Sequence, residues 1–351
     1  MEKGAQQYVW EGKIPLQVHL HESEVTTLPP PSPALILAPR IGYLPLLSSQ
    51  LKSFFSSALP PGVDTIWFEY KGLPLKWYIP TGVLFDLLCA EPERPWNLTV
   101  HFRGYPGDVL IPCDGEVCVK WSYINSLKEA AYIIHGSSKN VMNMSHSDQV
   151  NLWRSVMNGK LETYKCISSK LKLGIVSDAL SEKLKPSPLK ASRTPVRLYI
   201  WTVDEDFEDL EDASHFDSWD HISYINRPVE INREGKYLTL LDAIKSILPE
   251  FYSNSFNTIN SEINNELESV SSCQPEIKLV RIQGIEPKME IPFSWVVNNL
   301  INPDYFLHVC VYIKPPNTTT NKPFPENIFQ PHVVGNSLFR RRVSTSRRSL
   351  N

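Results

Sequence analysis

The hydrophobic pattern of the N-terminal third predicts a small mixed domain. Residues 14–22 alternate apolar and polar side chains, as a half-buried strand does. In the segment 46–59, apolar residues recur at spacings of three and four, which predicts a helix with one buried face. In chain order, the predicted elements are strands 14–22 and 34–37, helix 46–59, hairpin strands 65–70 and 75–79, helix 81–90 and strand 96–102.

The same order of elements recurs near the C-terminus. Three positions repeat at a constant offset of 212 residues, as the pairs Gly72 and Gly284, Pro80 and Pro292, and Leu88 and Leu300. Segments 196–203 and 229–232 are typical of strands and 238–248 of a helix, so they complete a second copy. The order ββαββαβ is the β-grasp arrangement of ubiquitin-like folds. The sequence therefore predicts two ubiquitin-like domains, at residues 12–105 and 191–315.

Between the two copies, residues 106–190 predict a helix-rich domain, so the expected class is α+β. Its apolar residues recur at helical spacing, notably Ile124, Leu127, Ala131 and Ile134. Residues 120–172 carry eight basic and three acidic side chains, which predicts a basic surface. We interpret the proline-containing stretches 186–188 and 194–195 as a stiff linker into the last domain.

Charge is segregated along the chain, although the net charge is only −3 over 351 residues. Residues 204–220 contain nine acidic and no basic side chains, and residues 254–274 are rich in Ser, Asn and Glu. We expect both to be insertions in the second ubiquitin-like domain. Residues 316–351 carry six basic side chains and one acidic, which predicts a disordered basic tail. Residues 1–11 form a separate N-terminal segment.

The motif search predicts no catalytic residue, metal site or cofactor. The sequence has no Walker loop, nucleophile elbow or Cys-x-x-Cys pair, and its 29 prolines outnumber its 15 glycines. His19 and His21 share one face of a predicted strand beside Glu22, but no third ligand follows at a suitable spacing, so we interpret them as a solvated face. Six scattered cysteines and the lack of a signal peptide predict a reduced, cytoplasmic protein.

Four segments of the chain are distinctive, namely residues 67–77 (WFEYKGLPLKW), 80–88 (PTGVLFDLL), 95–102 (PWNLTVHF) and 284–287 (GIEP). These segments resemble the autophagy protein five family. The resemblance extends from Trp10 to Lys314 and leaves out the arginine-rich tail. It implies a conjugated scaffold without catalytic chemistry of its own, built from two ubiquitin-like domains around a helical one.

The resemblance also nominates a site of covalent attachment. In that family, one lysine of the helical domain receives the C-terminal glycine of the ubiquitin-like autophagy protein twelve through an isopeptide bond. The E1-like autophagy protein seven and the E2-like autophagy protein ten carry out this step. The matching stretch here is SLKEAA at 126–131, which nominates Lys128. Neighbouring Glu129 favours the charged amine, so we expect the E2-like enzyme to supply the activation.

Further partners follow from the same resemblance. The conjugate is expected to bind autophagy protein sixteen, and residues 39–44 resemble a family segment near that groove, so Arg40 is expected to be a contact. The complex is expected to act like an E3 ligase, promoting transfer of autophagy protein eight from the E2-like autophagy protein three to phosphatidylethanolamine. We expect recruitment from the cytoplasm to the pre-autophagosomal structure and isolation membrane, and no nucleic-acid partner.

Two other classes of function stay open at this point. One is an unconjugated ubiquitin-like adaptor that binds membrane or nucleic acid through its basic tail, and the other is a thiol enzyme that uses Cys113 or Cys118.

Overall fold

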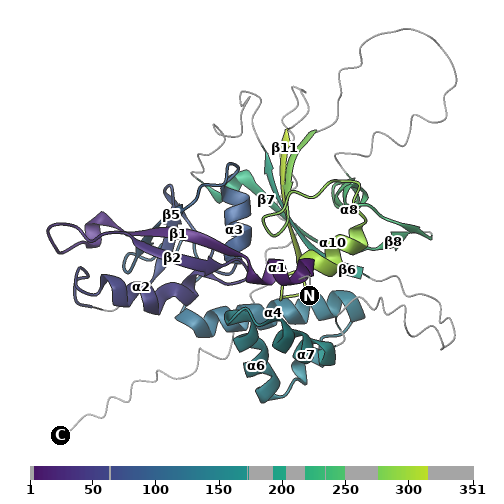
Figure 1. Cartoon of the computed structure of the whole chain (residues 1–351), viewed down its shortest axis with the longest axis horizontal. Helices are drawn as coiled ribbons and strands as arrows, with labels where there is room; N and C mark the ends of the chain where they lie inside the picture. The colour runs from purple at the N-terminus through teal and green to yellow at the C-terminus, as the bar shows by residue number, and fades with distance from the viewer. Residues whose placement is uncertain are drawn as a thin grey trace, which may run out of the picture.

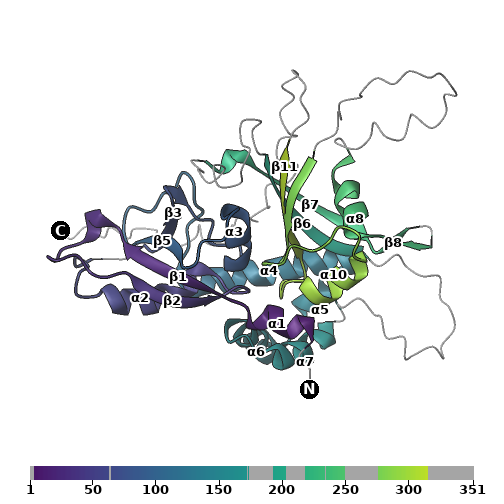
Figure 2. The same ribbon diagram turned by 45° about the horizontal axis from the view of Figure 1, so that its top comes forward.

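The computed structural model describes residues 4–62, 65–171, 173, 193–202, 218–233, 235–249 and 276–314. Two sheets with their helices lie on either side of helix α3 (Thr81–Leu88), and a group of helices packs beneath both (Figures 1 and 2). Helix α1 (Ala5–Glu11) lies where these parts meet and packs against α10 (Phe293–Leu300). This arrangement confirms the predicted class, two ubiquitin-like domains flanking a helical one.

The first ubiquitin-like domain is a five-stranded sheet with the order β2-β1-β5-β3-β4. The strands are β1 (Lys13–Leu20), β2 (Ala34–Pro39), β3 (Trp67–Tyr70), β4 (Leu73–Pro74) and β5 (Trp96–His101). Helices α2 (Ser48–Phe55) and α3 and the short 3-10 turns η1 (Glu22–Glu24) and η2 (Leu44–Leu47) join them. The alternation seen in the sequence of β1 is confirmed, because Ile14, Leu16 and Val18 are buried.

The second ubiquitin-like domain is a four-stranded sheet with the order β10-β11-β6-β7. Its strands are β6 (Arg193–Thr202), β7 (Ile222–Glu230), β10 (Glu276–Arg281) and β11 (Leu307–Lys314). Its other elements are α8 (Leu240–Ile247), α10, the turn η4 (Trp219–His221) and the hairpin of β8 (Asn232–Arg233) and β9 (Lys236–Tyr237). A capping box between Thr239 and Asp242 begins α8.

The helical domain consists of α4 (Gly115–His135), α5 (Lys139–Met142), α6 (His146–Met157) and α7 (Leu161–Leu171). Its apolar core also takes in Trp10 of α1 and Ile41 and Tyr43, which follow β2. The hydroxyls of Tyr123 and Tyr164 donate hydrogen bonds to the carbonyl oxygen of Pro303, at 3.1 and 2.8 Å. The helical domain is therefore tied to both ubiquitin-like domains.

The internal repeat predicted from the sequence is confirmed by its turns. Tyr70 pairs with Leu73 around Lys71 and Gly72, whose φ values are 49° and 87°. The equivalent bridge between residues 282 and 285 encloses Gln283 and Gly284, with φ values of 55° and 75°. Two successive positive φ angles are the mark of a type I′ turn, in which glycine at the second position relieves strain.

Three details of the predicted elements are wrong. The strand predicted at 229–232 begins earlier, because β7 (Ile222–Glu230) pairs with β6 along its whole length, and Asn232 belongs to β8. Residues 75–79 do not form a strand, because Trp77 turns toward the helical domain and its indole N–H donates to the carbonyl of Ile111 at 2.7 Å. Thr194 and Pro195 belong to β6 rather than to a linker. The other linker stretch, most of the acidic run, the polar run at 254–274 and the tail from 316 lie outside the described residues.

A buried ion pair of the first ubiquitin-like domain lies at its boundary with the second. Arg40, which follows β2, pairs with Asp86 of α3, and its guanidinium also donates to the carbonyl of Gly82 at 3.2 Å. The second carboxylate oxygen of Asp86 accepts the backbone N–H of Gly284 at 2.7 Å, across the domain boundary. Only 10% of the Arg40 side chain and 4% of that of Asp86 are exposed.

This geometry predicts that the two repeated turns respond differently to a methyl group. Both Gly72→Ala and Gly284→Ala place alanine at a positive φ, which costs about 1–2 kcal/mol. A Cβ at Gly284 would lie 2.7 Å from Cζ of Arg40, whereas a Cβ at Gly72 meets no atom within 4 Å. We expect Gly284→Ala to lose about 1–3 kcal/mol more than Gly72→Ala in urea unfolding of the full chain. Equal losses would contradict the overlap with the buried guanidinium.

Candidate functional site

Helix α4 carries the candidate acceptor and is anchored along most of its length. Its buried face includes Ile124, Leu127 and Ala131, as the helical spacing predicts, while Ile134 is only half-buried. Gly136 ends the helix at a φ of +70°, where its N–H donates to the carbonyl of Tyr132 at 2.7 Å. The helix therefore offers a firmly packed base for side chains on its outer face.

Lys128 lies at the border of the buried face, as its place beside Leu127 predicts. Its side chain is half-exposed, and Nζ lies 3.4 Å from Oδ1 of Asn125 and 6.0 Å from the ring centroid of Trp121. Within the described part of the chain, no carboxylate lies within ion-pairing distance of this amine. The amine thus has a neutral amide and an aromatic ring as neighbours.

Large apolar side chains stand exposed on the same side of α4. Val117, Trp121 and Tyr132 are 63%, 52% and 65% exposed. Together with Asn125 and Lys128 they recur at spacings of four, four, three and four residues, so they share one face of the helix. Large exposed apolar groups gathered around the Lys128 amine are the kind of surface that binds another protein.

Glu129, the residue after Lys128, is bound by the second ubiquitin-like domain. Its Oε2 pairs with Nη2 of Arg197 on β6 at 2.9 Å, and its Oε1 accepts a hydrogen bond from the side-chain amide of Asn226 on β7. Both oxygens of this carboxylate are therefore engaged across a domain boundary.

Arg197 was not predicted from the sequence, although its side chain contacts both the helical domain and other residues of the second ubiquitin-like domain. Its guanidinium lies 3.6 Å from the ring centroid of Phe306, and Nη1 contacts Oδ2 of Asp304 at 3.3 Å and Oγ of Ser126 at 3.2 Å. Asp304 also pairs with His308 at 3.1 Å. A charged residue inside the apolar run VRLYIWTV was the available signal, since such a residue must be paired if the strand is buried.

Arg40, expected to contact a partner, makes internal contacts in this chain. Its buried ion pair with Asp86 gives it a structural role at the boundary between the ubiquitin-like domains. No observation tests its expected contact with a partner, which stays a prediction.

The cysteines give little support to thiol chemistry. Burial raises the pKa of Cys113 to about 12 and that of Cys89 to about 12, and it also raises the pKa of Cys310 well above its usual value. Little thiolate is then present at these positions near neutral pH. Cys118 accepts a hydrogen bond from the backbone N–H of Asp114 at 3.1 Å.

The histidine pair has other partners than a metal. The ring of His19 contacts the side-chain amide of Gln17 at 3.0 Å, and that of His21 stacks on His101 with centroids 4.4 Å apart. Across the described ranges, no cluster of three or more His, Cys, Asp or Glu side chains could hold a metal ion. The described helices include none that is long and apolar enough to cross a membrane.

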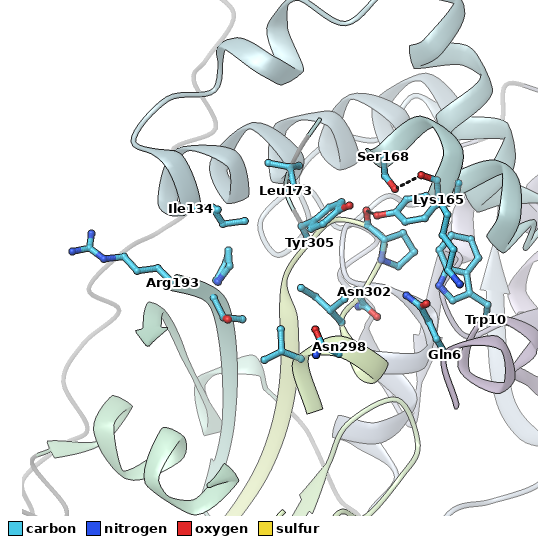
Figure 3. A pocket seen from close by; sticks show the side chains of 16 residues that line it. Gln6, Trp10, Ile134, Lys165, Ser168, Leu173, Arg193, Asn298, Asn302 and Tyr305 are labelled. Atoms are coloured by element: carbon cyan, nitrogen blue, oxygen red, sulfur yellow. Dashed lines mark hydrogen bonds between the residues drawn. The ribbon is translucent and has the colours of Figure 1, made fainter. Parts of the chain in front are cut away.

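A cavity of about 170 Å³ opens where α1, the helical domain and the second ubiquitin-like domain meet (Figure 3). Trp10 of α1, Ile134 of α4, Tyr164 of α7 and Asn298 of α10 contribute to its wall, together with Tyr305. Its lining residues include none from 12–105. The cavity thus joins three parts of the fold but involves one of the two ubiquitin-like copies.

Comparison with known proteins identifies all three parts. The chain matches the models "Autophagy protein ATG5, UblA domain" at residues 9–102, "alpha-helical bundle region" at 116–174 and "UblB domain" at 193–311. In fold it is similar to the crystal structure of Kluyveromyces marxianus Atg5, with a TM-score of 0.61 and 22% sequence identity over 87% of this chain and 98% of that one.

Curated relatives extend the similarity over nearly the whole chain. Autophagy protein 5 of Arabidopsis thaliana is 59% identical over 335 residues, covering 90% of this chain and 99% of that protein. Autophagy protein 5 of Oryza sativa subsp. indica is 55% identical over 351 aligned residues, covering 87% and 92%. The chain belongs to the autophagy protein 5 family and has a role in autophagy.

Proposed function

We propose that this chain is a scaffold conjugated through Lys128 to the ubiquitin-like autophagy protein twelve. The conjugate binds autophagy protein sixteen and acts like an E3 ligase. It promotes transfer of autophagy protein eight from the E2-like autophagy protein three to phosphatidylethanolamine, which leads to autophagosome formation. The chain itself contributes no catalytic group to this transfer.

The setting of the Lys128 amine carries this proposal. The amine stands half-exposed in the middle of a packed 21-residue helix, with no carboxylate partner among the described residues and with exposed Trp121 and Tyr132 on the same face. An acceptor amine has to reach an enzyme-bound thioester while its backbone stays in place, and this position meets both requirements.

The reaction is an acyl transfer onto nitrogen. The E1-like autophagy protein seven activates the modifier, and the E2-like autophagy protein ten presents its C-terminal glycine as a thioester. The deprotonated amine of Lys128 attacks the thioester carbonyl, the C–S bond breaks, and the enzyme's cysteine leaves as thiolate. The attacking nitrogen gives up a proton, so an isopeptide bond is formed.

The cavity at the three-way junction supports binding of a partner helix. Amphipathic helices dock by placing apolar side chains into grooves, and a cavity of ~150 Å³ is large enough for a benzene-sized group. We place one anchoring side chain of autophagy protein sixteen in the cavity of about 170 Å³ beside Trp10 and Tyr164.

Location follows from the same proposal. The conjugate is cytoplasmic and is recruited to the pre-autophagosomal structure and the isolation membrane. The basic helical domain favours a membrane with anionic lipids by about 1 kcal/mol for each well-placed Lys or Arg. An unconjugated adaptor acting through its basic tail is the competing class, and it requires no modification of Lys128.

Substitution of the acceptor separates these two classes. We expect Lys128→Arg to form no conjugate in a reconstituted reaction containing the E1-like and E2-like enzymes, because arginine keeps the charge but offers no usable nucleophile. Lys120→Arg, two turns earlier on α4, and Lys139→Arg are matched controls that should still be conjugated. The readout is the higher-mass band on a denaturing gel, with peptide mapping of the branch point. Conjugate on the Lys128→Arg protein would show that the site is wrong.

A substitution that fills the cavity tests the groove. Asn298 lies on its rim, and Asn298→Trp should weaken binding of a helical peptide of autophagy protein sixteen by about tenfold or more, because the indole occupies the space of the anchor. Asn298→Ala leaves the space open and should bind as the unsubstituted chain does in calorimetry. Undiminished binding by Asn298→Trp would place the groove elsewhere.

A further inference from the structure

We infer that Arg197 of the second ubiquitin-like domain is a positioning residue for conjugation. It fastens the turn of α4 that carries Lys128 and holds the carboxylate of Glu129 away from the acceptor amine. This inference rests on the proposed role of Lys128 as the acceptor, and its test is chosen to be separable from that role.

Glu129 is the acidic residue of α4 that Arg197 binds. It is adjacent to the acceptor in sequence, and a free carboxylate there favours the charged ammonium, which cannot attack a thioester. In the structure both carboxylate oxygens are occupied, Oε2 by Arg197 at 2.9 Å and Oε1 by Asn226. The Lys128 amine instead contacts Oδ1 of Asn125 at 3.4 Å. Arg197 and Asn226 of the second ubiquitin-like domain thus bind the carboxylate of Glu129, the acidic residue nearest to Lys128 in the sequence.

The side chain of Arg197 is itself held in one position by its contacts. Its side chain is 13% exposed, its guanidinium lies on the ring of Phe306, and Nη1 faces Asp304, which is almost completely buried. A planar guanidinium with contacts on its face and at both terminal nitrogens has little freedom to move. Arg197 is therefore a fixed point to which other elements can be fastened.

The turn of α4 around Lys128 is bound by Arg197 at two residues. Arg197 contacts α4 at Ser126 through Nη1, at 3.2 Å, and at Glu129 through Nη2. Leu127, between these residues, is completely buried. The residues on both sides of Lys128 are thus held by the second domain, while the lysine side chain itself extends from the border of the buried face.

The remaining charged and titratable groups at the junction do not replace Arg197. Burial raises the pKa of Tyr199 on β6 and of Tyr224 on β7, so both stay neutral. Burial opposes ionisation of Asp304, but His308 and Arg197 together hold the pKa of its carboxyl below the usual value. Removing the arginine therefore leaves Glu129 with no cationic partner among these residues.

The test measures the reactivity of the amine directly in the full-length chain. The protein is labelled with trace acetic anhydride at neutral pH, and acetylation of Lys128 is quantified by mass spectrometry relative to Lys120 of the same helix. We expect Arg197→Met to lower labelling of Lys128 about threefold, the effect of a unit charge about 7 Å away in water. Arg197→Met/Glu129→Gln should restore it, because no carboxylate is then released.

The same variants are compared in single-turnover conjugation from the charged E2-like enzyme. The Arg197→Met protein should be conjugated more slowly than the unsubstituted chain. The double variant should recover the part of the rate that was lost through the charge of Glu129, and this difference in rate should become smaller at high salt. Arg233→Met, at an exposed arginine of the same domain, should change neither readout. If Arg197→Met fails to fold, Asn226→Ala frees one carboxylate oxygen and should lower labelling in the same direction by a smaller factor.

Two results would overturn the inference. One is unchanged labelling and an unchanged rate in the folded Arg197→Met protein. The other is a loss of rate that the double variant does not restore, with unchanged labelling, which would leave Arg197 as a structural residue only. Failure of the proposed function has a different signature, namely a conjugate whose branch point maps away from Lys128, and the labelling result does not depend on it.

Discussion

Buried arginine side chains hold the three domains of this protein in one arrangement. A cation removed from water costs several kcal/mol unless a counter-ion and further hydrogen bonds compensate it. The charge of Arg40 is compensated by Asp86, whose carboxylate also accepts a hydrogen bond from the backbone N–H of Gly284. The charge of Arg197 is compensated by Asp304 and Glu129. The contact between Asp86 and Gly284 and the contact between Arg197 and Glu129 cross domain boundaries, whereas the Arg40–Asp86 and Arg197–Asp304 pairs each lie within one domain. Separating the domains would therefore leave the Glu129 carboxylate without its cationic partner.

The two ubiquitin-like copies show how one local structure serves two purposes. The turns at Gly72 and Gly284 have the same backbone geometry, because each closes a tight hairpin. Open space surrounds the first, whereas the guanidinium of Arg40 packs directly over the second. In the second copy, therefore, the glycine is required by conformation and also by the close approach of another domain.

The candidate acceptor Lys128 has only an amide and an aromatic ring as neighbours, but it lies on a helix that is tightly packed against the rest of the protein. Buried residues on α4, the glycine that ends it and the contacts with Arg197 and Asn226 all fix the backbone near Lys128. In the proposed conjugation, activation of the amine is left to the enzyme that delivers the thioester. Under that proposal, the chain contributes by positioning the Lys128 amine. Holding two reactants in the correct geometry removes a large part of the activation barrier of their reaction.

Much of the fold could be read from local patterns. Alternation predicted β1 and helical spacing predicted the buried face of α4, because each depends on residues close together in the chain. The 212-residue offset predicted the equivalence of Gly72 and Gly284, because each tight turn is determined by its own few residues. Lys128 was nominated as the acceptor by the resemblance of residues 126–131 to the autophagy protein five family, and this role stays a prediction.

The contacts between domains were decided only by the tertiary structure. Residues 75–79 look like a strand, yet Trp77 turns away because its indole binds a carbonyl 34 positions later in the chain. Arg197 looked like one polar residue in an apolar run, and its partner Glu129 lies 68 positions earlier. Periodicity reports which side of an element is buried, but it does not say what lies against that side. Which element lies against that side depends on how the domains pack together, and here the packing between domains sets the surroundings of Lys128.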